Sequence, residues 1–150
     1  MKALVSALAL LIGSNVMAVA ADQTLKHKLV AFYMGEKDGQ YHFVGTTVAP
    51  DGTIGTKDWT DKPGENGTTL GHSTYYFPDG SIVANYTAVS TGTNSGGHVV
   101  GKYQIISGTG AYQGATGGGG FEGDWGDKSP LKGAAFGLFD VELDVKTPGS

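Results

Sequence analysis

The stretch GKYQIISGTGAYQGATGGGGFEG, residues 101–123, decides the fold of this 150-residue chain. Residues 103–106 are mostly strand formers, and a Gly-Thr-Gly turn is expected to follow at residues 108–110. The glycine-rich second half continues into aromatic residues over residues 117–125. Glycine inside a strand marks bends and bulges, which suit a strongly coiled sheet better than a flat one. We therefore predict two adjacent strands of a closed β-barrel.

Alternation of apolar and polar residues predicts further strands, and no segment has the period of an amphipathic helix. The clearest case is residues 139–145, where one face is apolar and the other acidic. Eight segments are predicted as strands: residues 25–33, 41–48, 53–59, 71–77, 81–89, 98–106, 115–125 and 134–145. The predicted fold class is all-β, an eight-stranded antiparallel up-and-down barrel around side chains or one small ligand.

Turn and loop signals separate these segments. The sequences PDGT at residues 50–53 and PDGS at residues 78–81 have the residue order that β-turns favour. Residues 60–70 and 90–97 are small, polar and rich in glycine, so we expect two mobile loops there, and a third connection at residues 127–132. Loops of this kind at the mouth of a barrel often carry function.

Residues 1–20 have the pattern of a secretory signal peptide. Lys2 gives a positive start, residues 3–12 are apolar, and small residues at 18–20 form a cleavage site. Cleavage there leaves residues 21–150 as a single barrel domain that is secreted or periplasmic. No membrane insertion is expected, since no later apolar run is long enough to span a bilayer.

The composition excludes some kinds of partner. All ten basic residues are lysines, and without Lys2 nine lysines face fourteen acidic residues, a net charge of −5 with neutral histidines. Because there is no arginine and no cluster of lysines, nucleic acid is a poor partner. The chain has no cysteine, so its stability must come from the core and from closure of the sheet.

Residues 101–123 resemble a segment of the allene oxide cyclase and dirigent superfamily. The shared features are a strand, a Gly-Thr-Gly turn, an aromatic residue, a Gly-Ala pair and further glycines, which fall here on Tyr103, Ile105, Gly108, Thr109, Gly110, Tyr112, Gly114, Ala115 and Gly117. Residues 78–86, PDGSIVANY, are similar to the hairpin that precedes this motif in bacterial members. The resemblance implies an eight-stranded barrel with an apolar central cavity, and a homo-oligomer, a dimer or a trimer, as the assembly.

The resemblance also implies a ligand class. Members of the superfamily cyclise allene oxides, guide the coupling of phenoxy radicals or cyclise some bacterial polyketides, so the expected ligand is an apolar or aromatic small molecule. No cofactor is required for such chemistry. Dirigent proteins commonly have arginine in or near the cavity, and its absence here disfavours phenol coupling.

Two carboxylates, Glu122 and Asp124, and the phenol of Tyr103 are the candidate catalytic groups. The acids alternate with Phe121 and Trp125, so they share one face of their strand. On a cavity face, burial would raise a carboxyl pKa and make a general acid or base. The alternative is a solvated outer face opposite buried aromatic residues, as ordinary alternation predicts.

Four residues are candidate ligand-binding residues: Tyr86, Tyr76, His72 and Trp125. Aromatic rings in a cavity pack against an apolar ligand, and a phenol can donate to a carbonyl or an oxyanion. Tyr86 and Tyr103 are favoured because each lies in mid-strand beside the signature. His72 follows the expected loop at residues 60–70, where it could carry protons at the mouth. For most tyrosines, and for His72, a structural or exposed position is the alternative.

No metal site is predicted. The four histidines are far apart in the sequence, and the chain has neither an HExxH motif nor a cysteine pair. Asp58, Asp61 and Glu65 could gather around calcium, yet they lack the fixed ligand order of a calcium loop. A solvated acidic loop is the favoured interpretation.

Three functions stay open at this point. The first is an enzyme that holds an apolar substrate in one conformation and promotes its cyclisation or isomerisation. The second is a lipocalin-like carrier of a hydrophobic ligand, and the third is a structural module whose barrel is filled by its own side chains. A cavity with a buried titratable group favours the enzyme, a cavity without one favours the carrier, and a filled barrel favours the third.

Overall fold

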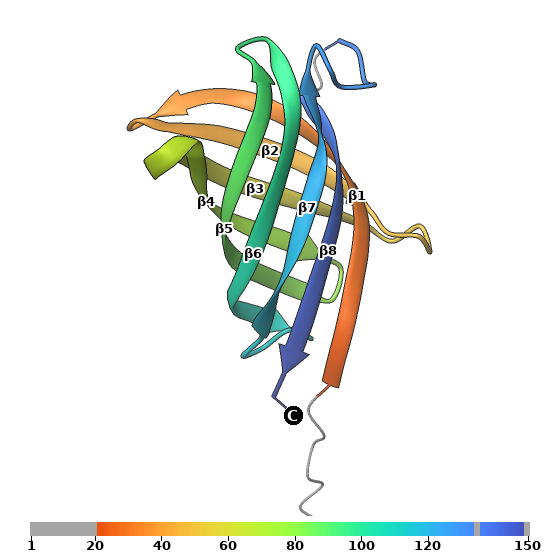
Figure 1. Cartoon of the computed structure of the whole chain (residues 1–150). Coiled ribbons are helices and arrows are strands. Elements are labelled where there is room, and N and C mark those ends of the chain that lie inside the picture. Colours follow the sequence, from red (N-terminus) through yellow and green to blue (C-terminus); the bar gives the residue numbers. More distant parts are fainter. Residues whose placement is uncertain (1–20, 134–135, 149–150) are drawn as a thin grey trace, which may run out of the picture.

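The chain forms a closed barrel of eight antiparallel strands that follow one another in sequence order (Figure 1). The strands are β1 (Ala21–Lys37), β2 (Gln40–Val48), β3 (Ile54–Pro63), β4 (Thr68–Phe77), β5 (Gly80–Thr93), β6 (Gly96–Gly110), β7 (Thr116–Gly126) and β8 (Gly137–Thr147). A short 3₁₀ helix, η1 (Glu65–Gly67), joins β3 to β4. The predicted fold class and the eight strands are confirmed.

This computed structural model describes residues 21–133 and 136–148. The expected signal peptide, residues 1–20, lies outside the described residues, as does the predicted start of the last strand at residue 134. Within the described ranges, no helix has the length and apolar character needed to cross a membrane.

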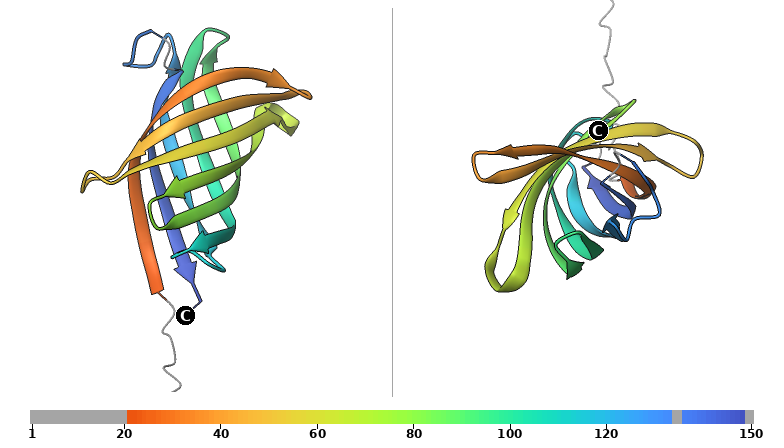
Figure 2. Two further views of the ribbon diagram at one scale, coloured as in Figure 1. Left: turned by 180° about the vertical axis from the view of Figure 1, so that it is seen from behind. Right: turned by 90° about the horizontal axis from the view of Figure 1, so that it is seen from above.

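Strand β1 closes the barrel by pairing along both of its sides. Its residues 21–31 pair with residues 137–147 of β8, and its residues 28–37 pair with residues 40–48 of β2. A β-bulge at residues 33–35 shifts the register with β2. Figure 2 shows the strand bending across the barrel between these two halves. Closure of this kind leaves no unpaired sheet edge to attract another chain.

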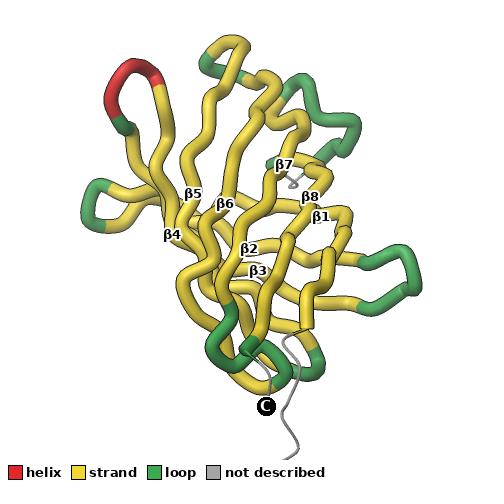
Figure 3. The backbone as a smooth tube through the Cα atoms, turned by 60° about the horizontal axis from the view of Figure 1, so that its bottom comes forward, coloured by secondary structure: helices red, strands yellow, loops and turns green. Residues whose placement is uncertain are grey.

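Two of the connections are shorter than the sequence predicted. The expected loop at residues 60–70 contains the end of β3 at Pro63, the helix η1 and the start of β4 at Thr68. The expected loop at residues 90–97 consists mostly of β5 and β6, which leave residues 94–95 as the turn between them. Polar and glycine-rich residues suggested loops, but paired strands continue through them, as Figure 3 shows.

The Gly-Thr-Gly segment is part of β6 and not a turn. It pairs with the first residues of β5, where the hydroxyl oxygens of Ser81 and Thr109 are 2.7 Å apart. The turn itself follows at residues 111–115. The glycines of β7 have the irregular backbone expected of a strongly coiled strand, since φ is 126° at Gly117 and 141° at Gly119.

Alternate residues of each strand point into the barrel, as the sequence pattern predicts. In β5 the buried residues are Ile82, Ala84, Tyr86 and Ala88, and in β8 they are Phe139, Val141, Leu143 and Val145. Their neighbours along the strands point outward and are exposed or half-buried. The core is therefore the interior of the barrel, with one hydrophobic cluster running along it.

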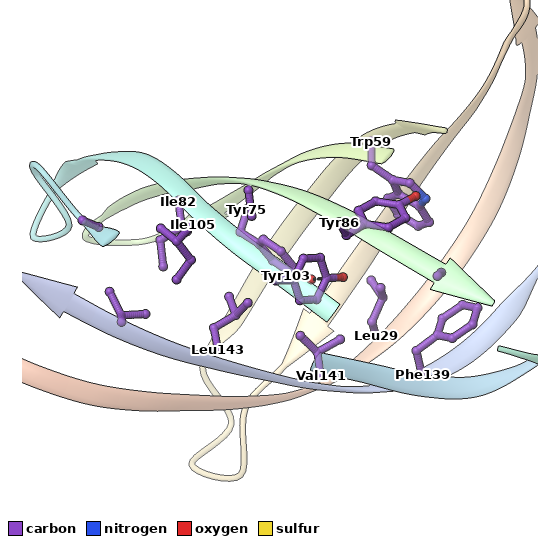
Figure 4. Close-up of a cluster of buried hydrophobic side chains, with 14 of the residues drawn as sticks. Leu29, Trp59, Tyr75, Ile82, Tyr86, Tyr103, Ile105, Phe139, Val141 and Leu143 are labelled. Carbon is purple, nitrogen blue, oxygen red and sulfur yellow. Dashed lines mark hydrogen bonds between the residues drawn. The ribbon is translucent and has the colours of Figure 1, made fainter. Parts of the chain in front are cut away.

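The interior has two parts. We call the part near the β4–β5 and β6–β7 turns the closed end, and its core residues are Ile82, Ile105, Tyr112, Leu143 and Val145. We call the opposite part, near the β5–β6 turn, the mouth. Tyr75 and Tyr103 lie between the two, with Ile82, Ile105 and Leu143 on one side and Trp59, Tyr86 and Phe139 on the other (Figure 4).

Candidate active site

A cavity of about 580 Å³ occupies the mouth of the barrel. Residues from all eight strands line it, and aromatic residues form much of its wall: Tyr33, Tyr41, Phe43, Trp59, Tyr86, Phe121, Trp125, Phe136 and Phe139. Its polar side chains, apart from those of the aromatic residues, are Lys57, Asp61, Thr69, Ser90, Thr93 and Asn94, of which Lys57 and Asp61 are ionisable. A concave space of this size, with apolar walls and few polar groups, is typical of a binding site for a small molecule.

Lys57 is a buried lysine where the mouth meets the closed end. It lies in β3, opposite Gly45 of β2 and Tyr75 of β4, and its residue surface is only 3% exposed. Its Nζ atom is 4.4 Å from the centroid of the Trp59 ring. Four more ring centroids lie within 5.6 Å of Nζ, those of Tyr75, Tyr86, Tyr103 and Phe121. These five rings, the aromatic box, attract a cation and offset part of its lost hydration.

Two hydrogen bonds converge on the phenol oxygen of Tyr103. Lys57 Nζ donates to it over 2.7 Å, and Tyr75 Oη donates to it over 2.8 Å. Burial raises the pKa of both phenols well above the ordinary tyrosine value, so both stay neutral at physiological pH. Tyr103 thus presents a neutral hydroxyl beside the amine of Lys57.

Asp61 is the second charged group of the cavity, on the same face of β3 as Lys57 but closer to the mouth. Tyr86 Oη donates a hydrogen bond to Asp61 Oδ2 over 3.0 Å. Gly71 of β4 lies opposite Asp61, and a Cβ atom there would be 1.9 Å from Cζ of Tyr86. The glycine therefore lets the Tyr86 ring lie across β4 and reach the carboxylate.

Burial moves both charged groups toward neutrality. Desolvation lowers the pKa of Lys57 to about 7, against the opposing effect of the Asp61 charge. Desolvation raises the pKa of Asp61 to about 6, against the opposing effects of the Tyr86 hydrogen bond and the Lys57 charge. Groups that titrate close to neutral pH can exchange protons with a ligand in either direction, and such perturbed groups in a cleft are typical of active sites.

Two of the predicted site residues, Tyr86 and Trp125, line this cavity, and a third, Tyr103, is connected to it by its hydrogen bond with Lys57. The two tyrosines are 5% exposed and belong to the aromatic box. Trp125 lines the cavity, stacks on Phe136 with a centroid distance of 5.3 Å, and donates from Nε1 to Ser90 Oγ over 2.9 Å. The structure thus brings these side chains together from β5, β6 and β7.

The predicted catalytic carboxylates lie elsewhere, on the outer face of β7. Glu122 is exposed, and Asp124 Oδ1 is 2.8 Å from His98 Nδ1 at the surface. Their neighbours Phe121 and Trp125 take the inward positions, so alternation sends both acids outward, as the alternative interpretation held. The expectation of a cavity carboxylate at these positions is therefore corrected, because Asp61 is the carboxylate of the cavity.

Tyr76 and His72 also lie on the outer face, in β4. Tyr76 is 50% exposed, and the exposed His72 has its Nδ1 atom 2.8 Å from Asn85 Oδ1. Ser73 and Tyr75 hold the inward positions of this strand. Neither Tyr76 nor His72 reaches the mouth cavity, so both are removed from the candidate site.

Sequence reasoning did not single out Lys57, and it assigned Asp61 to a solvated acidic loop. The available signal was the alternation in β3, which puts Lys57, Trp59 and Asp61 on the same face of the strand. This signal was missed because lysine is rarely found at an inward position. Asp61 is half-buried in a paired strand, because β3 continues to Pro63.

The described residues contain no group of three or more histidine, cysteine, aspartate or glutamate side chains placed to hold a metal ion. Comparison of the chain with protein-family models, with curated proteins and with solved structures found no match. The function is therefore inferred from the geometry of the mouth cavity.

Proposed function

We propose that this protein binds an apolar or aromatic small molecule in the mouth cavity and promotes its cyclisation or isomerisation by proton transfer, without a cofactor. One observation carries the proposal: a buried lysine and a partly buried aspartate, each hydrogen-bonded to a buried tyrosine, at a cavity with aromatic walls. The resemblance of residues 101–123 to the allene oxide cyclase and dirigent superfamily supports the same class of ligand.

The roles follow from the position and charge of each group. The aromatic walls hold the ligand in one folded conformation, which lowers the entropic part of the barrier. Lys57 or Tyr103 donates a hydrogen bond or a proton to an oxygen of the ligand, where negative charge develops. Asp61, ionised above a pKa of about 6, accepts a proton from carbon.

A carrier without chemistry is the second candidate, and the aromatic wall favours it as much as it favours an enzyme. The two candidate functions differ in whether they need Lys57 and Asp61. Burying a charge costs free energy that an apolar residue of the same size would not cost. A carrier of an apolar ligand gains nothing from two such groups, whereas proton transfer requires them.

The test uses a β,γ-unsaturated aryl ketone, whose shift to the conjugated isomer is followed by ultraviolet absorbance. We expect the wild-type protein to accelerate the shift and Asp61→Asn to lower kcat by about 10²-fold. Asp58→Asn, on the outer face of the same strand, is the matched control and should keep the wild-type rate. Circular dichroism checks that both variants fold.

Binding is measured in the same samples by quenching of Trp59 and Trp125 fluorescence, since both residues line the cavity. Quenching without conversion in the wild type would identify a carrier. No quenching with any apolar ligand would reject the binding function itself. Native mass spectrometry of the purified protein adds the identity of a co-purified ligand and tests the expected dimer or trimer.

A further inference from the structure

We infer that Lys57 forms an imine with a carbonyl group of the ligand, so that the substrate class is an apolar aldehyde or ketone. The inference deepens the proposed function and rests on it, because the ligand must first enter the mouth cavity. It differs from that proposal in assigning a covalent bond to one atom, Nζ of Lys57.

The position of Lys57 sets it apart from every other lysine in the described ranges. The eight others are exposed: Lys26, Lys28, Lys37, Lys62, Lys102, Lys128, Lys132 and Lys146. Lys57 instead lines the cavity with its amine inside the aromatic box. A carbonyl compound with an apolar body would pack against these rings and place its polar carbon at the one nucleophilic amine of the wall.

The surroundings of Lys57 favour the nucleophilic form of the amine. Desolvation by burial is the main cause of its lowered pKa, and the residue is only 3% exposed. With a pKa of about 7, half of the amine is neutral at pH 7, a fraction roughly 10³ times that of an ordinary lysine. A lysine desolvated in an apolar pocket is the usual way to prepare this nucleophile.

The groups facing Nζ can also manage the protons of the reaction. The nitrogen lone pair attacks the carbonyl carbon, a C–N bond forms, and one proton of the new ammonium passes through the hydroxyl of Tyr103 to the carbonyl oxygen, which leaves Tyr103 protonated as before. The resulting hydroxyl group takes a second proton from solvent at the mouth and leaves as water while the nitrogen lone pair forms the C=N bond. The protonated imine formed in this way returns that proton to solvent when it becomes the neutral imine. The amine and the carbonyl compound thus give an imine and one water, without any oxidant or reductant.

The imine has the charge that the aromatic box is suited to hold. Protonation of the imine nitrogen gives a cation at the position of the Lys57 ammonium, where five aromatic rings have their centroids within 5.6 Å. That cation draws electrons from the adjacent carbon of the ligand and makes its hydrogens more acidic. Asp61, on the same face of β3, is the carboxylate that would remove such a hydrogen.

The experiment traps the imine in the wild-type protein. The probe is 3-phenylpropanal with sodium cyanoborohydride at pH 7, and 3-phenylpropan-1-ol serves as a matched ligand without a carbonyl. Reduction fixes the imine as a secondary amine, and the protein gains the mass of the aldehyde less one oxygen atom. Peptide mapping then locates the adduct. We expect at least about tenfold more adduct on Lys57 than on any exposed lysine.

Two variants sharpen the result. Lys57→Met keeps an unbranched apolar side chain but no amine, so the adduct should be lost while the alcohol still quenches tryptophan fluorescence. Lys102→Met, on the outer face of β6, is the control and should leave the Lys57 adduct unchanged. Mapping in the wild type keeps the test decisive if Lys57→Met does not fold.

The failures of the two proposals are distinguishable. If the alcohol binds but the aldehyde gives no adduct on Lys57, or gives equal adducts on exposed lysines, the imine inference is wrong, whereas the proposed function is unaffected and is decided by the isomerisation assay. If neither probe nor any other apolar ligand quenches the fluorescence, the proposed function fails and the imine inference fails with it.

Discussion

The closed end and the mouth of the barrel are made by the same eight strands but bury different kinds of side chain. At the closed end, Ile82, Leu143 and Val145 are at most 1% exposed. At the mouth, the strands enclose a cavity, and two charged groups reach it, each with a tyrosine as hydrogen-bond partner. The closed end therefore stabilises the fold, whereas the burial of Lys57 and Asp61 at the mouth lowers its stability.

The largest expected effect is a pH-dependent difference between wild type and Lys57→Met. The pKa of Lys57 is about 7 in the folded protein, below its unfolded value of 10.5, so between these pH values the unfolded chain holds an extra proton. Wild-type stability therefore rises relative to the variant from pH 7 to pH 10, by on the order of 4 kcal/mol. Below pH 7 Lys57 is protonated in both the folded and the unfolded protein, so the full free-energy cost of burying its charge remains.

Urea unfolding of both proteins at pH 6, 8 and 9.5 measures this difference. The titratable groups that face Lys57 are Tyr75, Tyr86, Tyr103 and, toward the mouth, Asp61. The Asp61 carboxyl changes stability in a separate window, between about pH 4 and 6, with falling stability as pH rises. A constant difference from pH 8 to 9.5 would show that Lys57 is not desolvated, and the contrast between the two ends would disappear.

Truncation of one leucine at each end tests whether the mouth is less tightly packed. Leu143 is fully buried in the closed end, and Leu29 is 2% exposed but lines the cavity. Leu143→Ala should cost about 3 kcal/mol, since it leaves a new void among fixed neighbours. Leu29→Ala should cost about half as much, because it enlarges a space that already exists. Equal losses in urea unfolding would mean that the mouth packs as a core does.

The sequence predicted the closed end better than the mouth, for a physical reason. Alternation of apolar with acidic residues, as in residues 139–145, determines which side is buried. In β4 the segment STYYF has aromatic residues on both faces, so the pattern could not tell that Tyr75 points inward and Tyr76 outward. At Lys57 the site contradicts the general preference of lysine for water, and only the neighbouring Trp59 indicates its face. Functional groups that break a burial rule are the ones such a rule misses.

Substitution of Gly71 should loosen the mouth without touching a charged group. A Cβ atom at this position would meet the Tyr86 ring, so Gly71→Ala must displace the ring from Asp61, at a cost of about 2 kcal/mol. Because the Tyr86 hydrogen bond lowers the pKa of Asp61, its loss should raise that pKa further. Tyr86→Phe, which removes the hydroxyl alone, should raise the pKa likewise at a smaller cost in stability. NMR titration of the Asp61 carboxyl carbon is the measurement, and an unchanged pKa in both variants would show that the hydrogen bond is not made.

The smallest effect concerns the polar atoms that the closed end leaves without partners. His27 Nδ1 and Nε2 are buried and have no hydrogen-bond partner among the described residues, and the ring stacks on Phe77 with a centroid distance of 5.0 Å. His27→Phe keeps the stacking and removes the unpaired atoms, so it should stabilise the protein by about 1 kcal/mol at pH 7.

The sign of the pH dependence makes the His27 test specific. Desolvation lowers the pKa of His27 below 6.5, against the opposing charge of Asp51, so the unfolded chain binds a proton more readily and wild-type stability falls as the pH drops through this range. The advantage of His27→Phe in melting temperature should therefore grow from pH 7 to pH 5. His72→Phe, at an exposed histidine of the outer face, is the control and should show no such gain. An advantage that stays constant with pH would mean that His27 is protonated inside the barrel, and the closed end would then hold a buried charge as the mouth does.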